Sequence, residues 1–467
     1  MRKLLFILCL IFSTPTAARP ISAEDVIRLT REQSPAGLAI QLAPEIADYD
    51  IEIAKSQYDL NLKSQINHTV DKSERTSTIF GTESTLTNIN LSATQLTPSG
   101  TILDLSFNNI RQTSNSPFVT SSPVYDARAI LSVTQPILKN HFGLATRANV
   151  SMARKQREAL AYQAKSDLQD LTYKNLVTYW NWYLQLHLYR LNSEALTLAR
   201  KTLLTNQEKL ARGLLERIDL YTFSANLNLQ ENQLLTVKEQ IIKLENDLKY
   251  ALGIPDDAIH PAKNARHTPK GPDTTLIAEA LNSNPILATL RKDLEAHDIS
   301  IAVQKNARLP SLDLVGSFTL NGIDPGYDTA VNDIGDGHPI WAGGVNLNFP
   351  LQNRAATAGV KKLSLQKQQK LYSYQNAENK ILALTRDSFE RVLTNLKRLS
   401  VTAEMVRHQR LKWEGEITRY DQGRSSPDTV IRYQDEYLNA RKLELQTKVA
   451  VEMATLDLDY ARGHLLR

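Results

Sequence analysis

Apolar residues recur at helical spacing through two unusually long segments of the chain. Residues 144–212 contain neither glycine nor proline, and residues 352–422 are interrupted only by Gly359 and Gly415. A single helix of about 70 residues would be about 100 Å long, because each residue adds about 1.5 Å. That is longer than an ordinary globular domain is wide. The pattern therefore predicts two long, continuous helices.

A shorter helix is predicted after each long one, beyond Gly213 and Gly423. These helices span about residues 218–252 and 428–462. Their apolar positions step by three, four and seven residues, at Leu227, Leu234, Ile241, Leu244, Leu248 and Leu252, and at Leu438, Leu445, Val449, Met453, Leu456 and Tyr460. This spacing is typical of coiled coils. Each long helix is therefore predicted to turn at its glycine and return beside itself as an antiparallel hairpin.

Ahead of the long helices, apolar and polar residues alternate with the period of β-strands. Residues that share an apolar face are Leu131 and Val133; Leu312, Leu314, Phe318 and Leu320; and Trp341, Val345, Leu347 and Phe349. One apolar and one polar face fit a barrel wall with lipid outside and water inside, or a soluble sandwich with one buried face. So few strands cannot close their own sheet, and their unpaired edges favour closure by several copies.

The same order of features occurs twice along the chain. Equivalent positions are Pro35 and Pro285, Pro136 and Pro350, Gly213 and Gly423, and Tyr250 and Tyr460. The duplication predicts a mostly α fold with β-strands, built from two repeats of strands plus long antiparallel coiled-coil helices. The predicted divisions are repeat 1 at 19–255, with strands at about 61–136 and a helical hairpin at about 141–252; a linker at 256–275; and repeat 2 at 276–467, with strands at about 309–350 and a helical hairpin at about 352–462.

The strand region of the first repeat is the longer of the two, since Pro35 and Pro136 lie further apart than Pro285 and Pro350. The additional residues fit an extra β-hairpin at about 84–112. Two alternating runs there flank the turn formed by residues 97–100. Whether this hairpin joins the barrel or stands outside it is left open by the pattern.

The first 18 residues have the character of a secretory signal peptide. Arg2 and Lys3 precede an apolar run, and small residues follow at 16–18. The only cysteine, Cys9, lies in that run, so the mature chain is expected to contain none. This excludes disulfides, thiol catalysis and zinc–thiolate sites. No later stretch is apolar for long enough to predict a transmembrane helix, which leaves the periplasm, secretion or an outer-membrane β-barrel.

Catalytic and cofactor-binding patterns are missing from the sequence. The nine histidines form no metal-binding pair, and no glycine-rich phosphate loop occurs. Four acidic residues, Asp324, Asp328, Asp333 and Asp336, crowd one loop, where a solvated extracellular turn is favoured over a calcium site. The formal net charge of +5 is spread along helices whose acidic and basic residues alternate. We therefore expect no enzyme activity, no cofactor, no metal and no nucleic-acid partner.

In this order, the motifs resemble those of the TolC-type outer-membrane channel family, the outer membrane efflux proteins. The elements that carry the resemblance are Ser283-Asn284-Pro285-Ile286-Leu287, the strand entry at 307–312, the strand-to-helix turns at 135–138 and 349–351, the tips at 213–220 and 423–428, and the repeat end at 252–255. The resemblance covers about residues 23–465. Two departures are that residues 349–354 lack the Gly-Gly usual after the second turn, and that the second tip is one residue shorter from glycine to aspartate.

The resemblance implies a homotrimer in the outer membrane of a Gram-negative bacterium. Each subunit would give four strands to one shared 12-stranded-type β-barrel in contact with outer-membrane lipid, and its helices would form an α-helical tunnel in the periplasm. The tips would meet a periplasmic adaptor (membrane fusion) protein coupled to an inner-membrane pump. The function implied is passive export through the exit duct of a tripartite efflux pump or a type I secretion system.

The predicted functional residues lie at the two tips. The adaptor-contact residues are Gly213, Leu214, Leu215, Asp219, Gly423, Arg424, Ser425 and Ser426, and the candidates for the pore constriction are Asp428, Arg432 and Asp435. Capping of the last helix is the competing role for Ser425, Ser426 and Asp428. The alternative function is a periplasmic adaptor-like helical-hairpin interaction protein without a pore. No sequence pattern identifies the cargo or the pump family.

Overall fold

The structure is a computed structural model that describes residues 19–77, 79, 81–255, 257–262, 274–336 and 339–466. The predicted signal peptide and most of the predicted linker lie outside these residues. The described chain forms two compact units. Unit 1 comprises residues up to Ala43, Ala161–Ala288 and Gln375–Arg467, and unit 2 comprises Pro44–Leu160 and Thr289–Tyr374. Both units take residues from both predicted repeats, so the compact units and the repeats are different divisions of the chain.

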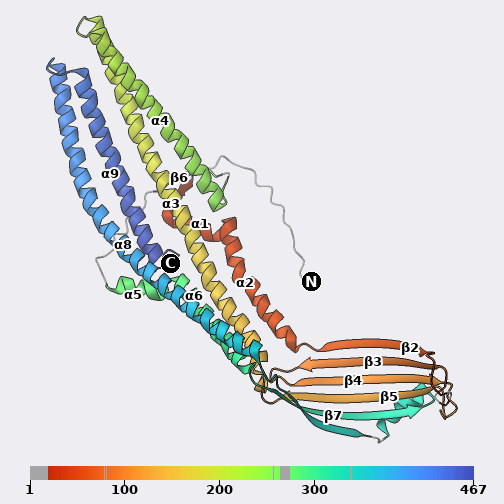
Figure 1. The fold of residues 1–467 in the computed structure, drawn as a ribbon. Helices are drawn as coiled ribbons and strands as arrows, with labels where there is room; N and C mark the ends of the chain where they lie inside the picture. The colour runs from red at the N-terminus through yellow and green to blue at the C-terminus, as the bar shows by residue number, and fades with distance from the viewer. Residues whose placement is uncertain are drawn as a thin grey trace. The chain divides into compact units, whose positions relative to one another are not determined.

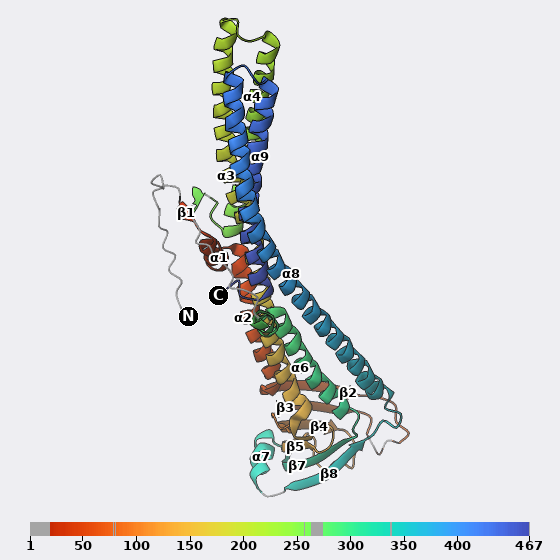
Figure 2. The ribbon, with the colours of Figure 1, turned by 90° about the vertical axis from the view of Figure 1, so that its left-hand side faces the viewer.

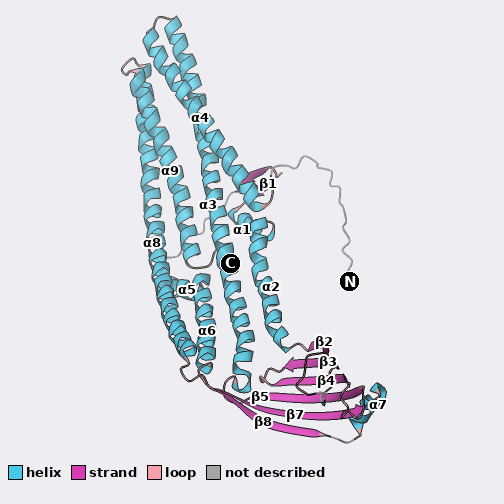
Figure 3. Ribbon diagram, turned by 45° about the vertical axis from the view of Figure 1, so that its right-hand side comes forward, coloured by secondary structure: helices cyan, strands magenta, loops and turns pink. Residues whose placement is uncertain are grey.

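Unit 2 contains a six-stranded antiparallel sheet (Figure 3). Its strands are β2 (Asn61–Asp71), β3 (Ser84–Leu96), β4 (Ile102–Ser114), β5 (Val124–Pro136), β7 (Ser311–Asp324) and β8 (Ile340–Asn348), and they lie side by side in that order. The predicted extra hairpin is β3 and β4, which lie between β2 and β5. The sequence left its place open, and the structure puts it in the sheet. The six strands of the sheet are thus the four that the family resemblance implies and the two of the predicted hairpin.

One face of this sheet is mostly apolar, as the strand register shows, with Ser64, His68, Thr87, Asn109 and Arg111 among its polar exceptions. Leu105 lies opposite Leu131, Leu131 opposite Phe318, and Phe318 opposite Trp341. The same face includes Leu62, Ile66, Val70, Ile89, Leu91, Leu103, Phe107, Val133, Leu314, Val345 and Leu347. The other face is mostly polar, with Lys63, Gln65, Asn67, Asn90, Ser92, Asp104, Ser106, Ser132, Thr134, Ser317, Thr319 and Asn346. Its apolar exceptions include Leu86, Leu96, Ile102, Ile110, Ile130, Val315, Ile323 and Ile340.

Helices continue from four of the six strands, all at the same end of the sheet (Figure 1). They are α2 (Pro35–Lys55), which precedes β2; α3 (Leu144–Ala211), which follows β5; α6 (Pro285–Asn306), which precedes β7; and α8 (Arg354–Asp421), which follows β8. A short helix, α7 (Tyr327–Asn332), lies at the other end of the sheet. It packs closely there, since a Cβ atom on Gly322 would come within 2.2 Å of the Ala330 carbonyl oxygen.

Asparagines make the two turns from strand to long helix. Asn140 and Asn353 adopt positive φ angles of 61° and 36°, which asparagine tolerates better than most residues. The Asn140 side-chain oxygen accepts hydrogen bonds from the amides of Ala145 and Thr146 at the start of α3, at 2.8 and 3.2 Å. The Asn353 side chain donates to the Arg308 carbonyl at 2.8 Å. Asn353 thus takes a left-handed conformation in the turn that lacks the family's usual Gly-Gly.

Unit 1 is built from two antiparallel helical hairpins (Figure 2). The first pairs α3 with α4 (Arg217–Leu252), and the second pairs α8 with α9 (Pro427–Ala461). The predicted long helices at 144–212 and 352–422 correspond to α3 and α8. No helix among the described residues is both long enough and apolar enough to cross a membrane.

The core of unit 1 lies where the hairpins meet β1 (Arg19–Ile21), α1 (Ala23–Glu32) and β6 (Ile259–Pro261), with β1 and β6 paired in parallel. The helix α5 (Thr274–Ser283) also belongs to this unit. Tyr179 and Trp182 of α3 are 0% and 1% exposed, and Tyr179 donates to the Ile21 carbonyl at 3.2 Å. Core packing therefore accounts for these aromatic residues. Burial of an apolar side chain of this size stabilises the unit by about 2–3 kcal/mol.

Gly143 is the glycine whose replacement should perturb the sheet most clearly. Its φ is 71°, and a Cβ atom there would meet the Pro98 carbonyl oxygen at 2.1 Å. The left-handed conformation alone costs a residue with a side chain about 1–2 kcal/mol. We predict that Gly143→Ala lowers the thermal stability of the detergent-purified protein, measured by circular dichroism. Gly316→Ala is the control, because a Cβ atom at Gly316 would meet nothing within 4 Å. Equal stability of the two variants would contradict the prediction.

Candidate functional site at the helical hairpin tips

The two hairpin tips have the same backbone geometry. Gly213 and Gly423 adopt φ angles of 73° and 70°, in the left-handed region. In the first tip the Gly213 amide donates to the Leu210 carbonyl, and the next amide donates to Lys209; the second tip repeats the pattern. This pair of bonds is the Schellman motif, which ends a helix at glycine. A Cβ atom at either glycine would meet nothing within 4 Å, so the backbone conformation alone requires glycine.

The two connecting loops are equally long in the structure, at residues 212–216 and 422–426. The one-residue difference between the tips, counted from glycine to aspartate, therefore does not lie in the loops. The difference arises because Asp219 is the third residue of α4, whereas Asp428 is the second residue of α9. The interval from glycine to aspartate therefore includes the first residues of α4 or α9 as well as the loop.

Ser425 and Ser426 have separate roles at the second tip. Ser426 is the N-cap of α9, and its hydroxyl accepts a hydrogen bond from the Thr429 amide. Such a cap stabilises a helix by about 1 kcal/mol. Ser425 instead donates to the carboxylate of Glu416 on α8, at 2.5 Å. One serine therefore starts α9, while the other connects the loop to α8.

The tips differ in the surface that they expose. At the first tip, Leu214, Ile218 and Tyr221 are 72%, 66% and 62% exposed. Ile218 and Tyr221 are three residues apart on α4 and so lie on the same side of the helix. At the second tip both neighbours of Gly423, Gln422 and Arg424, are exposed, and the other residues of that loop are serines. The first tip thus carries an apolar surface and the second a polar one.

Polar contacts join the two hairpins just inside the tips. Tyr420 of α8 donates to the side-chain oxygen of Asn206 on α3 at 2.6 Å, and Asn206 is only 2% exposed. Lys209 forms an ion pair with Asp421 at 3.2 Å, and its ammonium lies 4.5 Å from the centre of the Tyr420 ring. Sequence reasoning missed this group. The one sequence feature that could have indicated it is a difference between the repeats: Tyr420 in the second repeat corresponds to Leu210 in the first.

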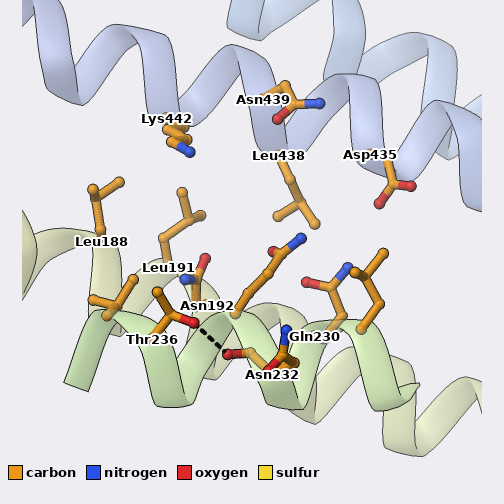
Figure 4. A pocket seen from close by; sticks show the side chains of 13 residues that line it. Leu188, Leu191, Asn192, Gln230, Asn232, Thr236, Asp435, Leu438, Asn439 and Lys442 are labelled. Carbon is orange, nitrogen blue, oxygen red and sulfur yellow. Dashed lines mark hydrogen bonds between the residues drawn. The ribbon is translucent and has the colours of Figure 1, made fainter. Parts of the chain in front are cut away.

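Asp435 lies in a groove between the hairpins, which Figure 4 shows from close by. The cavity measures about 360 Å³ and is lined by residues of α3, α4 and α9: Leu188, Leu191, Asn192, Leu229, Gln230, Asn232, Gln233, Thr236, Val237, Asp435, Leu438, Asn439 and Lys442. Burial raises the pKa of the Asp435 carboxyl above its usual value. Lys442 is the other charged residue in the lining.

The other two constriction candidates are not in this groove. Asp428 and Arg432 are exposed on α9, and the Arg432 guanidinium lies 5.1 Å from the ring of its neighbour Tyr433. The spacing of Asp428, Arg432 and Asp435 places the three residues on one side of α9. Within a single chain, however, only Asp435 lines the cavity.

A second set of contacts joins α3 to α9 further from the tips. Tyr173 donates to the Asp457 carboxylate at 2.7 Å, and Tyr460 donates to Asp170 at 2.6 Å, with the two rings 4.8 Å apart. Burial, together with the hydrogen bond to Asp457, raises the pKa of Tyr173 to about 12. Both tyrosines therefore stay protonated and able to donate at physiological pH. The paired contacts hold α9 against α3.

Known proteins resemble this chain in part of its sequence and in its fold. Residues 276–464 match the family model described as outer membrane efflux protein. No curated protein sequence gives a significant match. The matched residues are those of the second predicted repeat, which is therefore similar to the outer membrane efflux protein family.

Solved structures show the same fold over nearly the whole chain. CusC, whose structures concern transmembrane channel formation, is 12% identical with a TM-score of 0.72 and covers 94% of this chain and 92% of its own. The outer membrane channel CmeC of Campylobacter jejuni is 18% identical with a TM-score of 0.70, covering 95% and 85%. The outer membrane protein VceC of Vibrio cholerae is 15% identical with a TM-score of 0.71, covering 94% and 96%. At these identities the likeness establishes the fold.

Nothing in the described part of this chain suggests a metal centre. No group of three or more His, Cys, Asp or Glu residues is placed to hold an ion there. In the acidic loop between β7 and β8, the Asp324 carboxylate accepts from the Gly326 amide at 2.8 Å, which is a turn interaction. The chemistry of the site is therefore that of helix ends, buried polar contacts and one carboxyl in a groove.

Asp435 provides a pH test of the packing between the hairpins. A raised pKa means that the folded state holds the proton more tightly than the unfolded chain does. This contribution to stability is therefore complete below the unfolded pKa and is lost as pH rises through the raised one. We predict that Asp435→Asn stabilises the protein at pH 7 and that its advantage over the wild type disappears at low pH.

Unfolding of the detergent-purified protein at several pH values measures this difference. Glu239→Gln, an exposed position on α4, is the control. A wild type less stable than Asp435→Asn by the same amount at every pH would contradict the assignment.

Proposed function

We propose that this protein is the outer-membrane exit duct of an export system that crosses the cell envelope. Three copies close their sheets into one barrel in the outer membrane, and the helical hairpins form a tunnel that extends into the periplasm. The observation that carries the proposal is the two-faced sheet of unit 2. Its apolar face suits lipid and its mostly polar face suits water, as in a barrel wall.

The two edges of the sheet support closure by further copies. β2 and β8 each have a neighbour on one side only. Each edge strand also adjoins a helix with exposed apolar residues. On α2, Ile46, Tyr49 and Ile53 are 63%, 72% and 68% exposed, and on α8, Leu365 and Tyr372 are 67% and 61% exposed. If β2 of one copy pairs with β8 of the next, each copy is rotated relative to its neighbour. Repeating this rotation produces a closed ring when it divides a full turn.

The helical tips are proposed to meet a periplasmic adaptor protein, which is in turn coupled to an inner-membrane pump. The apolar surface of Leu214, Ile218 and Tyr221 is suited to a protein contact, because exposed apolar residues gain most from burial against a partner. The polar second tip would supply hydrogen-bonding and charged groups. Transport through the duct would be passive, and the pump would supply the energy.

The pore constriction is proposed to lie beside the second tip. Asp428, Arg432 and Asp435 occupy one side of α9, so three copies would present three such stripes. Asp435 would reach the pore if the groove between the hairpins opens. The contacts of Tyr420 with Asn206 and of Lys209 with Asp421 oppose that opening.

A periplasmic adaptor-like protein without a pore is the alternative function. Two observations disfavour it: the sheet has an apolar face with no covering layer over most of its length, and the chain carries two hairpins. Leu62, Ile66 and Trp341 on that face are 69%, 68% and 76% exposed. Such a face would be costly in water unless another chain covered it.

The proposal is tested by locating and reconstituting the protein. We expect it in detergent-extracted outer membranes as a trimer that conducts ions in planar lipid bilayers. Neutralising Arg432 or Asp435 should change ion selectivity, because a fixed charge beside the narrowest point attracts the opposite ion. Lys238→Gln, an exposed charge on α4, is the control. A soluble periplasmic monomer would contradict the proposed function, and unchanged recordings for all three charge variants, Asp428→Asn included, would remove these residues from the constriction.

A further inference from the structure

We propose that the closed barrel has 18 strands, six from each of three copies, and that β3 and β4 form part of its wall. This inference rests on the proposed function, and it concerns the width of the duct. Four strands per chain would give 12 in a trimer. Because barrel diameter grows roughly linearly with strand number, the barrel would be about one and a half times as wide.

The hydrogen-bond ladder is the first observation. β3 pairs with β2 from Asn61↔Thr94 to Asp71↔Ser84, along the whole of β2. On the other side, β4 pairs with β5 from Ile102↔Thr134 to Gln112↔Val124. A hairpin standing outside the barrel would leave β2 and β5 to pair with each other, yet here each pairs with the hairpin. In lipid, backbone groups left without such partners cost several kcal/mol each.

The faces of the hairpin agree with those of its neighbours. Ile89 lies opposite Ile66 of β2, and Leu105 lies opposite Leu131 of β5. On the other face, Ser106 and Asn108 continue the polar side. A shift of one residue would have reversed every side chain. The hairpin therefore has the alternation required of a strand pair between lipid and water.

The turn of the hairpin is fitted into the junction between sheet and helices. Gly100 and Gly143 approach so closely that a Cβ atom on Gly100 would lie 3.1 Å from the Gly143 Cα. Thr101 donates a hydrogen bond to the Gln135 side chain of β5. On the other side, Gln95 donates to the Tyr58 carbonyl, next to β2, at 3.2 Å. The turn thus contacts both flanking elements at the level where the strands end.

The partner that completes the wall is a second copy of this chain. β2 and β8 are the open edges of the sheet, and the inserted hairpin changes neither of them. The exposed apolar residues on α2 and α8 continue these same edges into the helices. An edge contact from β2 to β8 therefore closes the ring with the hairpin included.

A wider barrel moves the control of passage to the helices. Four strands in each chain continue into helices, whereas β3 and β4 turn back at residues 97–101. Barrels of 16–18 strands leave a water-filled channel. The barrel would then admit wide cargo, and size selection would fall to the helical tips.

Electron cryomicroscopy of the detergent-extracted trimer tests the inference by counting strands. We expect 18 strands in the full chain and 12 in a variant that lacks residues 84–114. In that variant, β2 and β5 remain joined at the end of the sheet away from the helices. A full-chain trimer with 12 strands and the hairpin outside would overturn the inference and leave the proposed function standing. Absence of any closed barrel would overturn both.

If the deletion variant fails to assemble, a chemical measurement of the width of the duct also distinguishes 18 strands from 12. Ser132 lies on the polar face of β5, and Ser132→Cys would place a thiol in the duct. In the full-length trimer on intact cells, we expect this thiol to react with maleimides on polyethylene glycol chains too wide for a 12-stranded barrel. Leu131→Cys, on the opposite face, is the control and should not react. Exclusion of the wide reagents, with labelling by small ones, would overturn the inference.

Discussion

The proposed assembly depends on the pairing of backbone groups at the two open edges of the sheet. In a lipid phase each unpaired N–H or C=O group costs several kcal/mol, so a sheet with open edges must be closed. The six strands of one chain leave the outer sides of β2 and β8 open. The proposed ring satisfies these groups with copies of the same chain. The apolar residues exposed on α2 and α8 lie beside the same edges and would be covered by the same contact.

The duplication of the chain takes on a physical meaning under this constraint. Each repeat supplies strands that lead into one long helical hairpin, so two repeats in each of three copies would share the proposed ring. The repeats are not equivalent. The first holds the inserted strands β3 and β4 and has an apolar tip at Leu214, whereas the second has a polar tip whose loop is connected to α8 through Ser425 and Glu416. Under the proposed function, the first repeat was modified in the barrel wall and the second beside the constriction.

The sequence predicted the individual helices and strands better than it predicted which of them lie side by side. The periodicity of the long helices and the alternation in the strands are local properties, so α3, α8 and the β3–β4 hairpin correspond to the predicted segments. The position of that hairpin between β2 and β5 depends on long-range pairing, which no local pattern reports. The residues of the candidate site also divide into those set by local conformation and those set by long-range contacts. The turns at Gly213 and Gly423 follow from the local conformation of glycine, whereas the contact of Tyr420 with Asn206 joins helices that are far apart in the sequence.

The central claim is that one face of the sheet meets lipid and the other meets water, with β4 in the wall. Single cysteines placed along β4 at positions 103–108 test it directly, because the mature chain is expected to contain no cysteine of its own. In intact outer membranes, a membrane-impermeant thiol reagent should label positions 104, 106 and 108, which lie on the polar face, and spare positions 103, 105 and 107. Uniform labelling of all six positions would contradict the account.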